Sequence, residues 1–483
     1  MKRKYTIGIC LACVIVLNLA YLIWVIPRLN GAAGYIFYLS EWGLFTSTIL
    51  FAFCHYQLYS KEASQHLMHH HMPTVDVFIP CYDEPISMIR RTVCVATEMT
   101  YHRKTIYILD DGHRQEVKKI AEEHGVHYLA RKENKDAKAG NLNNALNYSH
   151  GEYLLILDAD QVPEKNIIEH ILPHFTRHDI AFVTTKQRFD VCKEDFNRDC
   201  FFYEHVQLGK SYDGCPISTG SGVIYRRSAI KSIGGFSTWN LVEDLTTSYS
   251  LHQNGYKSVY LEHPYTTGLA PQDLKNIYKQ RGTWAVDTLR LFFHKNPFLV
   301  KGLNFRQRVH YFELCYSYIA SAVFLPTLFI FLPFALFFNY IVVNSGWEYV
   351  IIRAPGLIGI IWFYEYLSKG AESNQFWAGF WPVYLKAIFL ALRKQKISYK
   401  VTDKVEVPGR RIELVLPQLT LLVIGLIGIP FNIIAYGPSS VTAITSIWVA
   451  LELWWMFPII MRGFAKEHRH KPMLHPEIHG AFT

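Results

Sequence analysis

Long apolar blocks at both ends of the chain, separated by an extended polar stretch, constrain the fold more than any other feature. A helix needs about 20 apolar residues to cross a bilayer. Blocks of roughly this length lie at 5–27, 35–57, 314–340, 349–367, 413–436 and 440–461. Residues 58–300 instead mix charged residues with Gly and Pro. The sequence therefore predicts about six membrane-spanning helices and one domain outside the bilayer.

The first block could in principle be a cleaved signal peptide. Its apolar region is longer than the usual ~7 to 15 residues, and no convincing small-residue cleavage site follows it. We therefore expect a retained anchor. The expected division of the chain is two membrane helices in 1–60, the polar domain with interface helices in 61–300, four membrane helices in 301–465 and a short cytosolic tail in 466–483.

The distribution of Lys and Arg predicts the orientation of these helices. The amino terminus, the connection at 392–411 and the carboxyl-terminal tail are basic, whereas the other short connections carry two basic residues among them. Basic connections stay in the cytosol, so we expect a cytosolic polar domain on a chain held in the plasma (inner) membrane. The net charge of +9 then reflects topology and acidic lipid headgroups, and it requires no nucleic-acid partner.

Cysteine and histidine residues do not indicate a disulfide framework or a metal centre. Nine cysteines are scattered, and the CxxC pair Cys10 and Cys13 lies inside the first apolar block. We interpret them as small buried residues in a reducing compartment. The histidine-rich stretch 68–72 is interpreted as a solvated loop next to the membrane.

Strand-length apolar runs alternate with helix-period segments through the polar domain. The runs lie at 75–80, 105–111, 126–130, 153–160 and 180–186. This alternation predicts a parallel sheet covered by helices, and ligands bind at the carboxyl ends of the strands in such sheets. Three runs end there in PCYDEP, DDG and DAD, so we expect these groups to meet in one crevice.

The acidic pair in LDADQVP is the strongest chemical signal. Asp158 and Asp160 follow an apolar run one residue apart, so their side chains share a face of an extended chain. Clustered carboxylates stay ionised when a cation lies among them. Oxygen ligands suit Mg²⁺ or Mn²⁺, and Mg²⁺ commonly bridges to substrate phosphates. An acidic loop without a ligand is the alternative, but the position of the pair favours a metal site for a diphosphate-bearing substrate.

Seven motifs, in order, resemble those of the processive family 2 glycosyltransferases, the cellulose synthase and hyaluronan synthase group. They are PCYDEP, LDDG, KAGNLNNAL, LDADQVP, STGSGVIYRRSAI, LVEDLTTSYSLHQNGYKSVYL and QRGTW, within roughly 73–300. YKVTDK at 399–404 resembles the FxVTxK gating loop of bacterial cellulose synthases, with Tyr399 in place of Phe, which favours that branch. The resemblance implies a GT-A-type, Rossmann-like α/β domain inserted into an α-helical membrane domain, with a cytosolic gating loop at about 393–411.

The resemblance also implies roles for individual residues. Those assigned to the nucleotide sugar are Tyr82, Glu84, Asp111, Lys138, Asp158, Arg281, Thr402 and Lys404. The first three would hold the uridine, and Lys138 would lie near the diphosphate. Asp158 and Asp160 would hold Mg²⁺ or Mn²⁺, with Asp160 as the direct ligand.

Asp244 in VED would be the general base. Inverting transfer needs a carboxylate that takes the proton from the acceptor hydroxyl as this hydroxyl attacks the anomeric carbon. The metal would stabilise the charge that develops on the departing UDP. Without the resemblance, the simplest interpretation of Glu243 and Asp244 is that they begin a helix, because acidic residues are favoured at helix amino termini.

The acceptor polymer would contact Gly220, Ser221, Glu243, Gln280 and Trp284. Small residues in STGSG would let a polymer pass close to the backbone, although an ordinary turn is an alternative there. QRGTW departs from the family pattern QxxRW because Thr283 holds the arginine position. Either Arg281 or the basic gating loop would then neutralise the diphosphate, and the departure could mark a different product linkage.

Two features of the membrane part add to the prediction. Residues 273–318 mix aromatic residues with Lys and Arg, which predicts amphipathic helices at the cytosolic interface. Glu452 lies well inside a span, where an ionisable group is costly unless it faces water or protein, so it would line a sugar path or pack against a helix. Most of the tryptophans Trp362, Trp448, Trp454 and Trp455 are expected in interface belts.

These features lead to the hypothesis of a metal-dependent, inverting, processive enzyme. It would polymerise a β-glucan from UDP-glucose, as cellulose, a mixed-linkage glucan or a capsular glucan, and secrete it through its own spans. Two alternatives stay open: an enzyme that adds one sugar to a lipid acceptor, and a non-catalytic scaffold or transporter that keeps the fold. The tail after the last span is too short for a PilZ domain, so control by cyclic-di-GMP within this chain is not expected.

Overall fold

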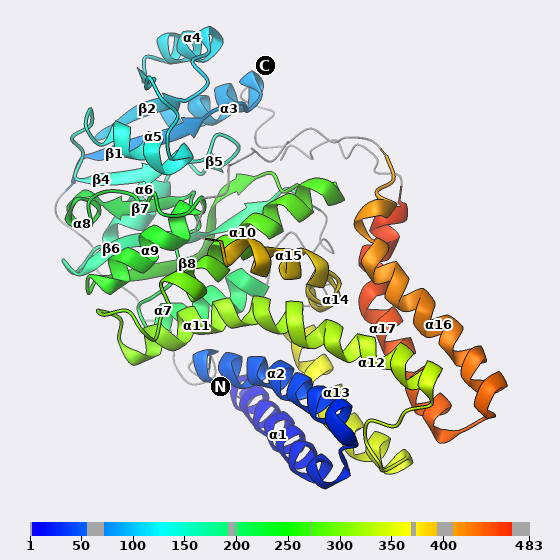
Figure 1. Ribbon diagram of the computed structural model, residues 1–483. Helices are drawn as coiled ribbons and strands as arrows, with labels where there is room; N and C mark the ends of the chain where they lie inside the picture. Colours follow the sequence, from blue (N-terminus) through cyan, green and yellow to red (C-terminus); the bar gives the residue numbers. More distant parts are fainter. Residues whose placement is uncertain are drawn as a thin grey trace.

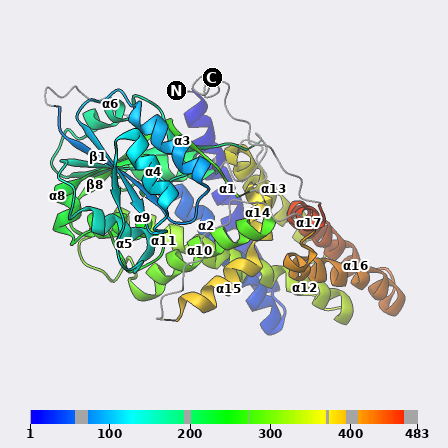
Figure 2. The same cartoon turned by 90° about the horizontal axis from the view of Figure 1, so that it is seen from above.

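The computed structural model of the chain describes residues 2–55, 72–191, 199, 201–271, 273–368, 373–393 and 409–465. They form an α/β domain and a helical part that extends away from it (Figure 1). Helices α10 (Leu274–His294), α14 (Ser373–Gly379) and α15 (Trp381–Ala391) lie where the two parts meet. Seen from above, they separate the sheet from α16 (Leu416–Tyr436) and α17 (Ser440–Phe464) (Figure 2).

An eight-stranded sheet occupies the centre of the α/β domain, in the order β3-β2-β1-β4-β7-β6-β8-β5. Strands β1 and β4 are buried along their whole length, and apolar except for Asp76 of β1, because helices cover both faces of the sheet. Each of the predicted runs contains a strand, whereas β5, β7 and β8 were not predicted. The bounds are β1 Val75–Cys81, β2 Lys104–Asp110, β3 His127–Leu129, β4 Tyr153–Ile156, β5 Val162–Pro163, β6 Ile180–Phe189, β7 Val223–Arg226 and β8 Lys257–Gly268.

The strand directions differ from the prediction in part of the sheet. β1 runs parallel to β2 and β4, β3 runs parallel to β2, and β6 runs parallel to β8. β7 instead lies antiparallel to β4, with Val223 opposite Ile156. The chain enters β7 from the carboxyl end of β4, where the N–H of Gly222 bonds to the carbonyl of Ile156, so β7 must run back. The predicted parallel sheet is therefore correct for β3, β2, β1 and β4 but wrong at β7.

Alternate side chains of β1 enter two separate cores, as the two-residue period of a strand requires. Val77 and Ile79 pack with Ile89 on one face, and Phe78 packs with Leu142 on the other. These cores fix the sheet, and with it the loops at its carboxyl edge. The covering helices are α3 (Ile86–Thr97), α4 (Gln115–His124) and α6 (Ile167–Ile171) on the first face, and α5 (Ala137–Ala145), α8 (Arg227–Ser232) and α9 (Glu243–Gln253) on the second.

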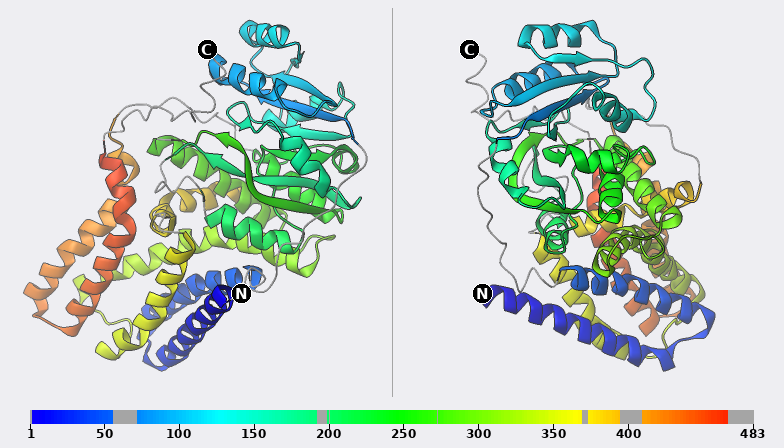
Figure 3. Two further views of the ribbon diagram at one scale, coloured as in Figure 1. Left: turned by 180° about the vertical axis from the view of Figure 1, so that it is seen from behind. Right: turned by 90° about the vertical axis from the view of Figure 1, so that its left-hand side faces the viewer.

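Five helices in the described residues are long and apolar enough to cross a membrane: Gly8–Arg28, Gly31–His55, Phe305–Phe338, Leu416–Tyr436 and Ser440–Phe464. The first two correspond to α1 (Lys2–Val25) and α2 (Gly31–His55). The remaining predicted span, 349–367, forms α13 (Trp347–Ser368). This helix carries Arg353 and is not among the five. α13 packs against α1 within the same bundle (Figure 3). Five of the six predicted spans therefore form helices with the length and composition that a membrane crossing needs.

The third of these helices begins earlier than the sequence predicted, at Phe305 rather than 314. It consists of α11 (Phe305–Ile319), a π-helical turn at Ala320–Phe324 and α12 (Leu325–Phe338). π-helical turns are frequent at functional sites. The remaining short helices are η1 (Ile26–Arg28), η3 (Leu172–His174), η5 (Phe202–Val206), α7 (Gln207–Tyr212) and η7 (Ile412–Leu414).

Candidate active site

A cavity of about 1370 Å³ opens at the carboxyl ends of β1, β2 and β4 and continues between the helices of the membrane part. Polar groups that follow these three strands meet in this cavity, as the sequence predicted. Its wall also includes residues of α9 and α10. The predicted site residues that line it are Tyr82, Glu84, Asp111, Lys138, Asp158, Asp160, Gly220, Glu243, Asp244, Gln280, Arg281 and Trp284.

Lys138, in the first turn of α5, joins three of the motifs at the centre of this cavity. Its Nζ lies 2.6 Å from Asp158 Oδ1 and 3.0 Å from Glu243 Oε1, and it donates a 2.9 Å hydrogen bond to the carbonyl of Gly220. Burial lowers the pKa of Lys138, but the carboxylates of Asp158 and Glu243 outweigh burial and raise the pKa well above its usual value. Lys138 therefore carries a stable positive charge among the acidic residues.

Asp158 and Asp160 follow β4 with the buried Ala159 between them. Burial raises the pKa of Asp158 to about 6, and the charge of Asp160 acts in the same direction, while Lys138 opposes both. A divalent cation beside the pair would favour the ionised form of Asp158.

The described part of the chain holds no group of three or more His, Cys, Asp or Glu residues suited to a metal. Mg²⁺ commonly binds through one or two carboxylates, with substrate phosphates and water completing its ligands. Asp158 and Asp160 therefore fit a divalent ion that binds together with a diphosphate. A closed metal site made only of protein ligands would need more donors than this pair supplies.

Asp244 lies in the first turn of α9, beside the backbone of Gly220. A Cβ placed on Gly220 would lie 2.7 Å from Asp244 Oδ2 and 3.4 Å from Lys138 Nζ. Burial raises the pKa of Asp244 to about 8 and the charge of Glu243 adds to this, while Lys138 and the backbone N–H of Leu245 lower it. A carboxylate with a raised pKa is suited to take a proton from a sugar hydroxyl.

The raised pKa of Asp244 predicts a rate that rises with pH. A base must be ionised, so kcat/KM should increase as the pH passes through the Asp244 pKa and then level off. Glu243→Gln removes a charge that raises this pKa, so the profile should move to lower pH by about one unit. The pH dependence of UDP release measures this. Glu98→Gln, at an exposed ion pair with Lys165, is the control, and an unmoved profile in Glu243→Gln would contradict the assignment.

Gly220→Ala tests the contact between this glycine and the base. Gly220 has a φ of +77°, and a methyl group there would displace the Asp244 carboxylate. We expect activity to fall by roughly 100-fold, the effect of misplacing a reacting group by about 1 Å. Gly255→Ala is the matched control, because Gly255 has a φ of +83° but no neighbour within 4 Å of the added Cβ. Equal losses of activity in Gly220→Ala and Gly255→Ala would show that backbone strain alone causes the effect.

Ser221 is placed differently from its neighbour Gly220. It is fully buried and does not line the cavity in the described structure. Its hydroxyl accepts a 2.9 Å hydrogen bond from the backbone N–H of Asp158. The position of Ser221 therefore fits a positioning role, in which its hydroxyl holds the end of β4, rather than the predicted contact with the acceptor.

The residues predicted to hold the uridine already have partners, in their own loop or in the loop that follows the next strand. Arg131 binds both carboxylate oxygens of Asp111, each at 2.7 Å, and Asn134 donates to the Asp111 carbonyl. Glu84 accepts a hydrogen bond from the backbone N–H of the exposed Tyr82. The sequence analysis missed Arg131, although it follows β3, whose carboxyl end lies beside that of β2. The position of Arg131 directly after β3 was the sequence signal that could have identified this residue.

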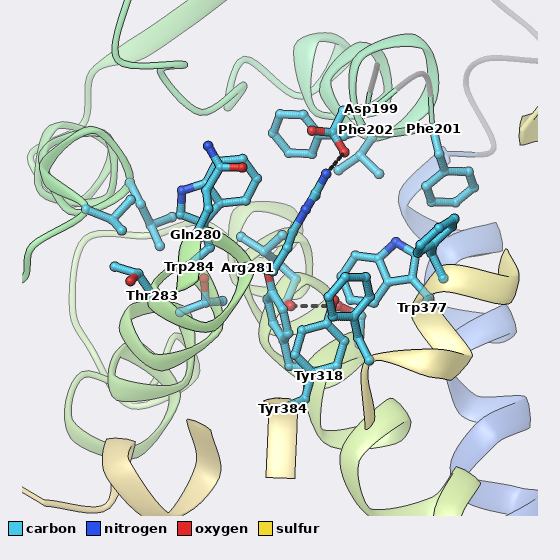
Figure 4. A pocket seen from close by; sticks show the side chains of 18 of the residues that line it. Asp199, Phe201, Phe202, Gln280, Arg281, Thr283, Trp284, Tyr318, Trp377 and Tyr384 are labelled. Atoms are coloured by element: carbon cyan, nitrogen blue, oxygen red, sulfur yellow. Dashed lines mark hydrogen bonds and ion pairs between the residues drawn. The ribbon is translucent and has the colours of Figure 1, made fainter. Parts of the chain in front are cut away.

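Helix α10 presents the QRGTW motif to the cavity (Figure 4). Gln280 and Trp284 are four residues apart and lie on one face of the helix. Arg281 is buried, pairs with Asp199 at 2.8 Å and lies over the ring of Trp284 at 4.9 Å. Arg281 and Thr283 therefore both line the cavity, and Arg281 carries an ion pair with Asp199 that was not expected from the sequence.

Thr402 and Lys404 lie outside the described residues, as do most of the predicted gating loop at 393–411 and of the histidine-rich stretch 68–72. Their predicted roles stay predictions.

Aromatic and aliphatic side chains line the membrane half of the cavity. Trp448, Trp454 and Trp455 of α17 belong to this wall, together with Trp377 of α14. Trp362 does not line the cavity and is 48% exposed on the outside of α13. The interface-belt interpretation therefore fits Trp362 but not the three tryptophans of α17.

Glu452 of α17 does not line the cavity in the described structure. It is fully buried, and a Cβ on Gly425 of α16 would lie 3.8 Å from its Oε2. Neither carboxylate oxygen has a hydrogen-bond partner among the described residues. Of the two alternatives, this position fits packing between helices.

Comparison with known protein families agrees with this geometry. Residues 76–234 match the family described as Glycosyl transferase family 2, and residues 232–354 match the family described as Cellulose synthase. Residues 76–234 of the chain therefore resemble glycosyl transferase family 2, and the region that follows resembles the cellulose synthase family. The two matched regions adjoin and together include the predicted motifs from PCYDEP to QRGTW, as well as α11, α12 and the start of α13.

Curated relatives of this chain include two bacterial cellulose synthase catalytic subunits [UDP-forming]. One, from Komagataeibacter xylinus, is 33% identical over 361 residues, which cover 69% of this chain and 47% of the relative. The other, from Pseudomonas fluorescens (strain SBW25), is 31% identical over 411 residues, covering 79% and 54%. The chain thus spans about half the length of the curated relatives it matches.

A solved structure with the same fold is a mannosyltransferase from Pyrobaculum calidifontis in complex with GDP-Man and Mn²⁺. It has a TM-score of 0.57 and 18% identity, and the match covers 74% of this chain and 98% of that protein. The GT-A-type fold predicted from the motifs is therefore confirmed.

Proposed function

We propose that this chain is a metal-dependent, inverting glycosyltransferase of the plasma membrane that polymerises a β-glucan from UDP-glucose and passes the product through its own helices. The observation that carries the proposal is the continuity of one cavity. This cavity joins the site around Lys138 and Asp244 to the aromatic wall of α17. A growing polymer at the site would therefore have a route between the membrane helices. UDP-glucose rests on the cellulose synthase relatives.

The residues of the site support this chemistry. Asp244 would take the proton from the acceptor hydroxyl, and Trp284 would stack against the terminal sugar ring. Asp158 and Asp160 would hold Mg²⁺ or Mn²⁺, which, when bound, neutralises charge on the departing diphosphate. Lys138 would hold the carboxylates in place and add positive charge on the same side.

An enzyme that transfers one sugar to a lipid is the second candidate. The aliphatic residues that line the membrane half of the cavity, such as Leu328, Leu357 and Ile360, favour it because they could accommodate an acyl chain. Incubation of the purified protein with radiolabelled UDP-glucose separates the two candidates. A polymerase yields material of high molecular weight that glucanases degrade, whereas the lipid enzyme yields only an organic-soluble product, which would overturn the proposal.

Removal of divalent ions should abolish activity. The carboxylates of Asp158 and Asp160 repel each other and the diphosphate unless a cation lies among them, so we expect a loss of at least about 100-fold in chelator. Added Mg²⁺ or Mn²⁺ should restore the rate. Asp160→Asn should raise the metal concentration needed for half-maximal activity, measured as UDP release. Donor turnover that continues unchanged in chelator would contradict the metal site.

A further inference from the structure

An ion pair joins three helices in the membrane part. Arg353 of α13 donates from Nε to Glu41 Oε1 of α2 at 2.8 Å, and from Nη1 to Asn18 Oδ1 of α1 at 3.1 Å. The hydroxyl of Tyr21 donates to the other oxygen of Glu41, and the guanidinium of Arg353 lies 4.8 Å from the centre of the Tyr21 ring. The pair therefore has a fixed geometry at a depth where charge is costly.

Both members of the pair line the cavity. Arg353 Nη2 has no hydrogen-bond partner among the described residues, and it is not one of their fully buried, unpartnered atoms. It therefore keeps a donor that faces accessible space. A pair that served only to hold the helices together would not need to expose a donor to the cavity.

The apolar wall around this donor indicates what kind of ligand it could bind. The neighbouring lining residues Phe45, Leu328 and Leu357 offer no hydrogen bond from their side chains. A sugar polymer can stack its rings on such a surface, but its hydroxyl groups lose their water there and need polar partners. Arg353 supplies such a donor, and Glu41, whose two carboxylate oxygens accept from Arg353 and Tyr21, neutralises its charge.

We propose that the Arg353–Glu41 pair is a contact point for the exported polymer, the uncharged β-glucan of the proposed function. The inference rests on the proposed function. A polymer of acidic sugars would need an excess of positive charge along this wall, and Arg353 is neutralised by Glu41.

Paired substitutions separate this role from helix packing. Glu41→Leu with Arg353→Met removes both charges, and replacing a buried ion pair by apolar residues often leaves folding intact. We expect this double variant to add the first sugars at the wild-type rate but to make products roughly fivefold shorter, the effect of about one lost hydrogen bond. Glu41→Gln with Arg353→Gln keeps polar groups and should restore part of the length. Arg28→Met, at an arginine outside the cavity wall, is the control.

The outcomes are distinguishable. If the wild type makes no polymer, the proposed function fails first. If it makes polymer and the apolar double variant makes products of the same length at the same rate, the pair has only a packing role and the inference is wrong. Thermal unfolding in detergent shows whether each variant is folded. Anion-exchange chromatography of the wild-type product tests the proposed function by itself, because retention of the product as a polyanion would contradict a β-glucan.

Discussion

Asp244→Asn should reduce sugar transfer by roughly 10³-fold, the range that general-base catalysis typically supplies. Asparagine has the shape of aspartate and would still lie beside Gly220, but its amide cannot take a proton from the acceptor hydroxyl. The carboxylate is also the one whose pKa is raised to about 8 by burial and Glu243, so it is the best-suited base among the lining acids. UDP release from UDP-glucose measures the loss.

The same variant separates catalysis from folding. Binding of UDP should be close to that of the wild type because Tyr82, Asp111 and Asp158 remain. Asp179→Asn, at an exposed ion pair with Arg177, is the matched control and should keep full activity. Normal polymer formation by Asp244→Asn would favour the alternative of a non-catalytic scaffold or transporter that keeps the fold.

The sequence predicted the part of the site that depends on strand ends. The apolar runs that became β1, β2 and β4 end in PCYDEP, DDG and DAD, and parallel strands bring such ends to one edge. This rule was sufficient to place Tyr82, Asp111 and Asp158 in one cavity. The antiparallel β7 was not predicted, because its direction depends on where the chain returns to the sheet rather than on its own residues.

Contacts between distant segments were beyond sequence reasoning. Lys138 is separated from Glu243 and Gly220 by much of the domain, and only the packing of α5 and α9 on one face of the sheet brings them together. Arg353 was not singled out in the sequence, since one charged residue gives no sign of its partner. Its pairing with Glu41 depends on the packing of α13 against α1 and α2.

Lys138→Met should lower activity by roughly 10² to 10³-fold, because the variant keeps the length of the side chain but removes the cation that stabilises the site. Asp158 and Glu243 would lose a partner within 3.0 Å. Lys138 also lowers the pKa of both Asp158 and Asp244. The remaining activity should therefore need a higher pH, a shift opposite to that of Glu243→Gln.

This opposite shift makes the test specific to the charge of Lys138. A loss caused by poor folding would lower the rate at every pH without moving the profile, whereas loss of the cation moves it. Lys118→Met, at an exposed position of α4, is the control for removing a lysine. Lys138→Arg keeps the charge and should leave the profile near that of the wild type even if its larger head group lowers the rate. A Lys138→Met enzyme with the wild-type rate and pH profile would show that the carboxylates of this site do not depend on Lys138.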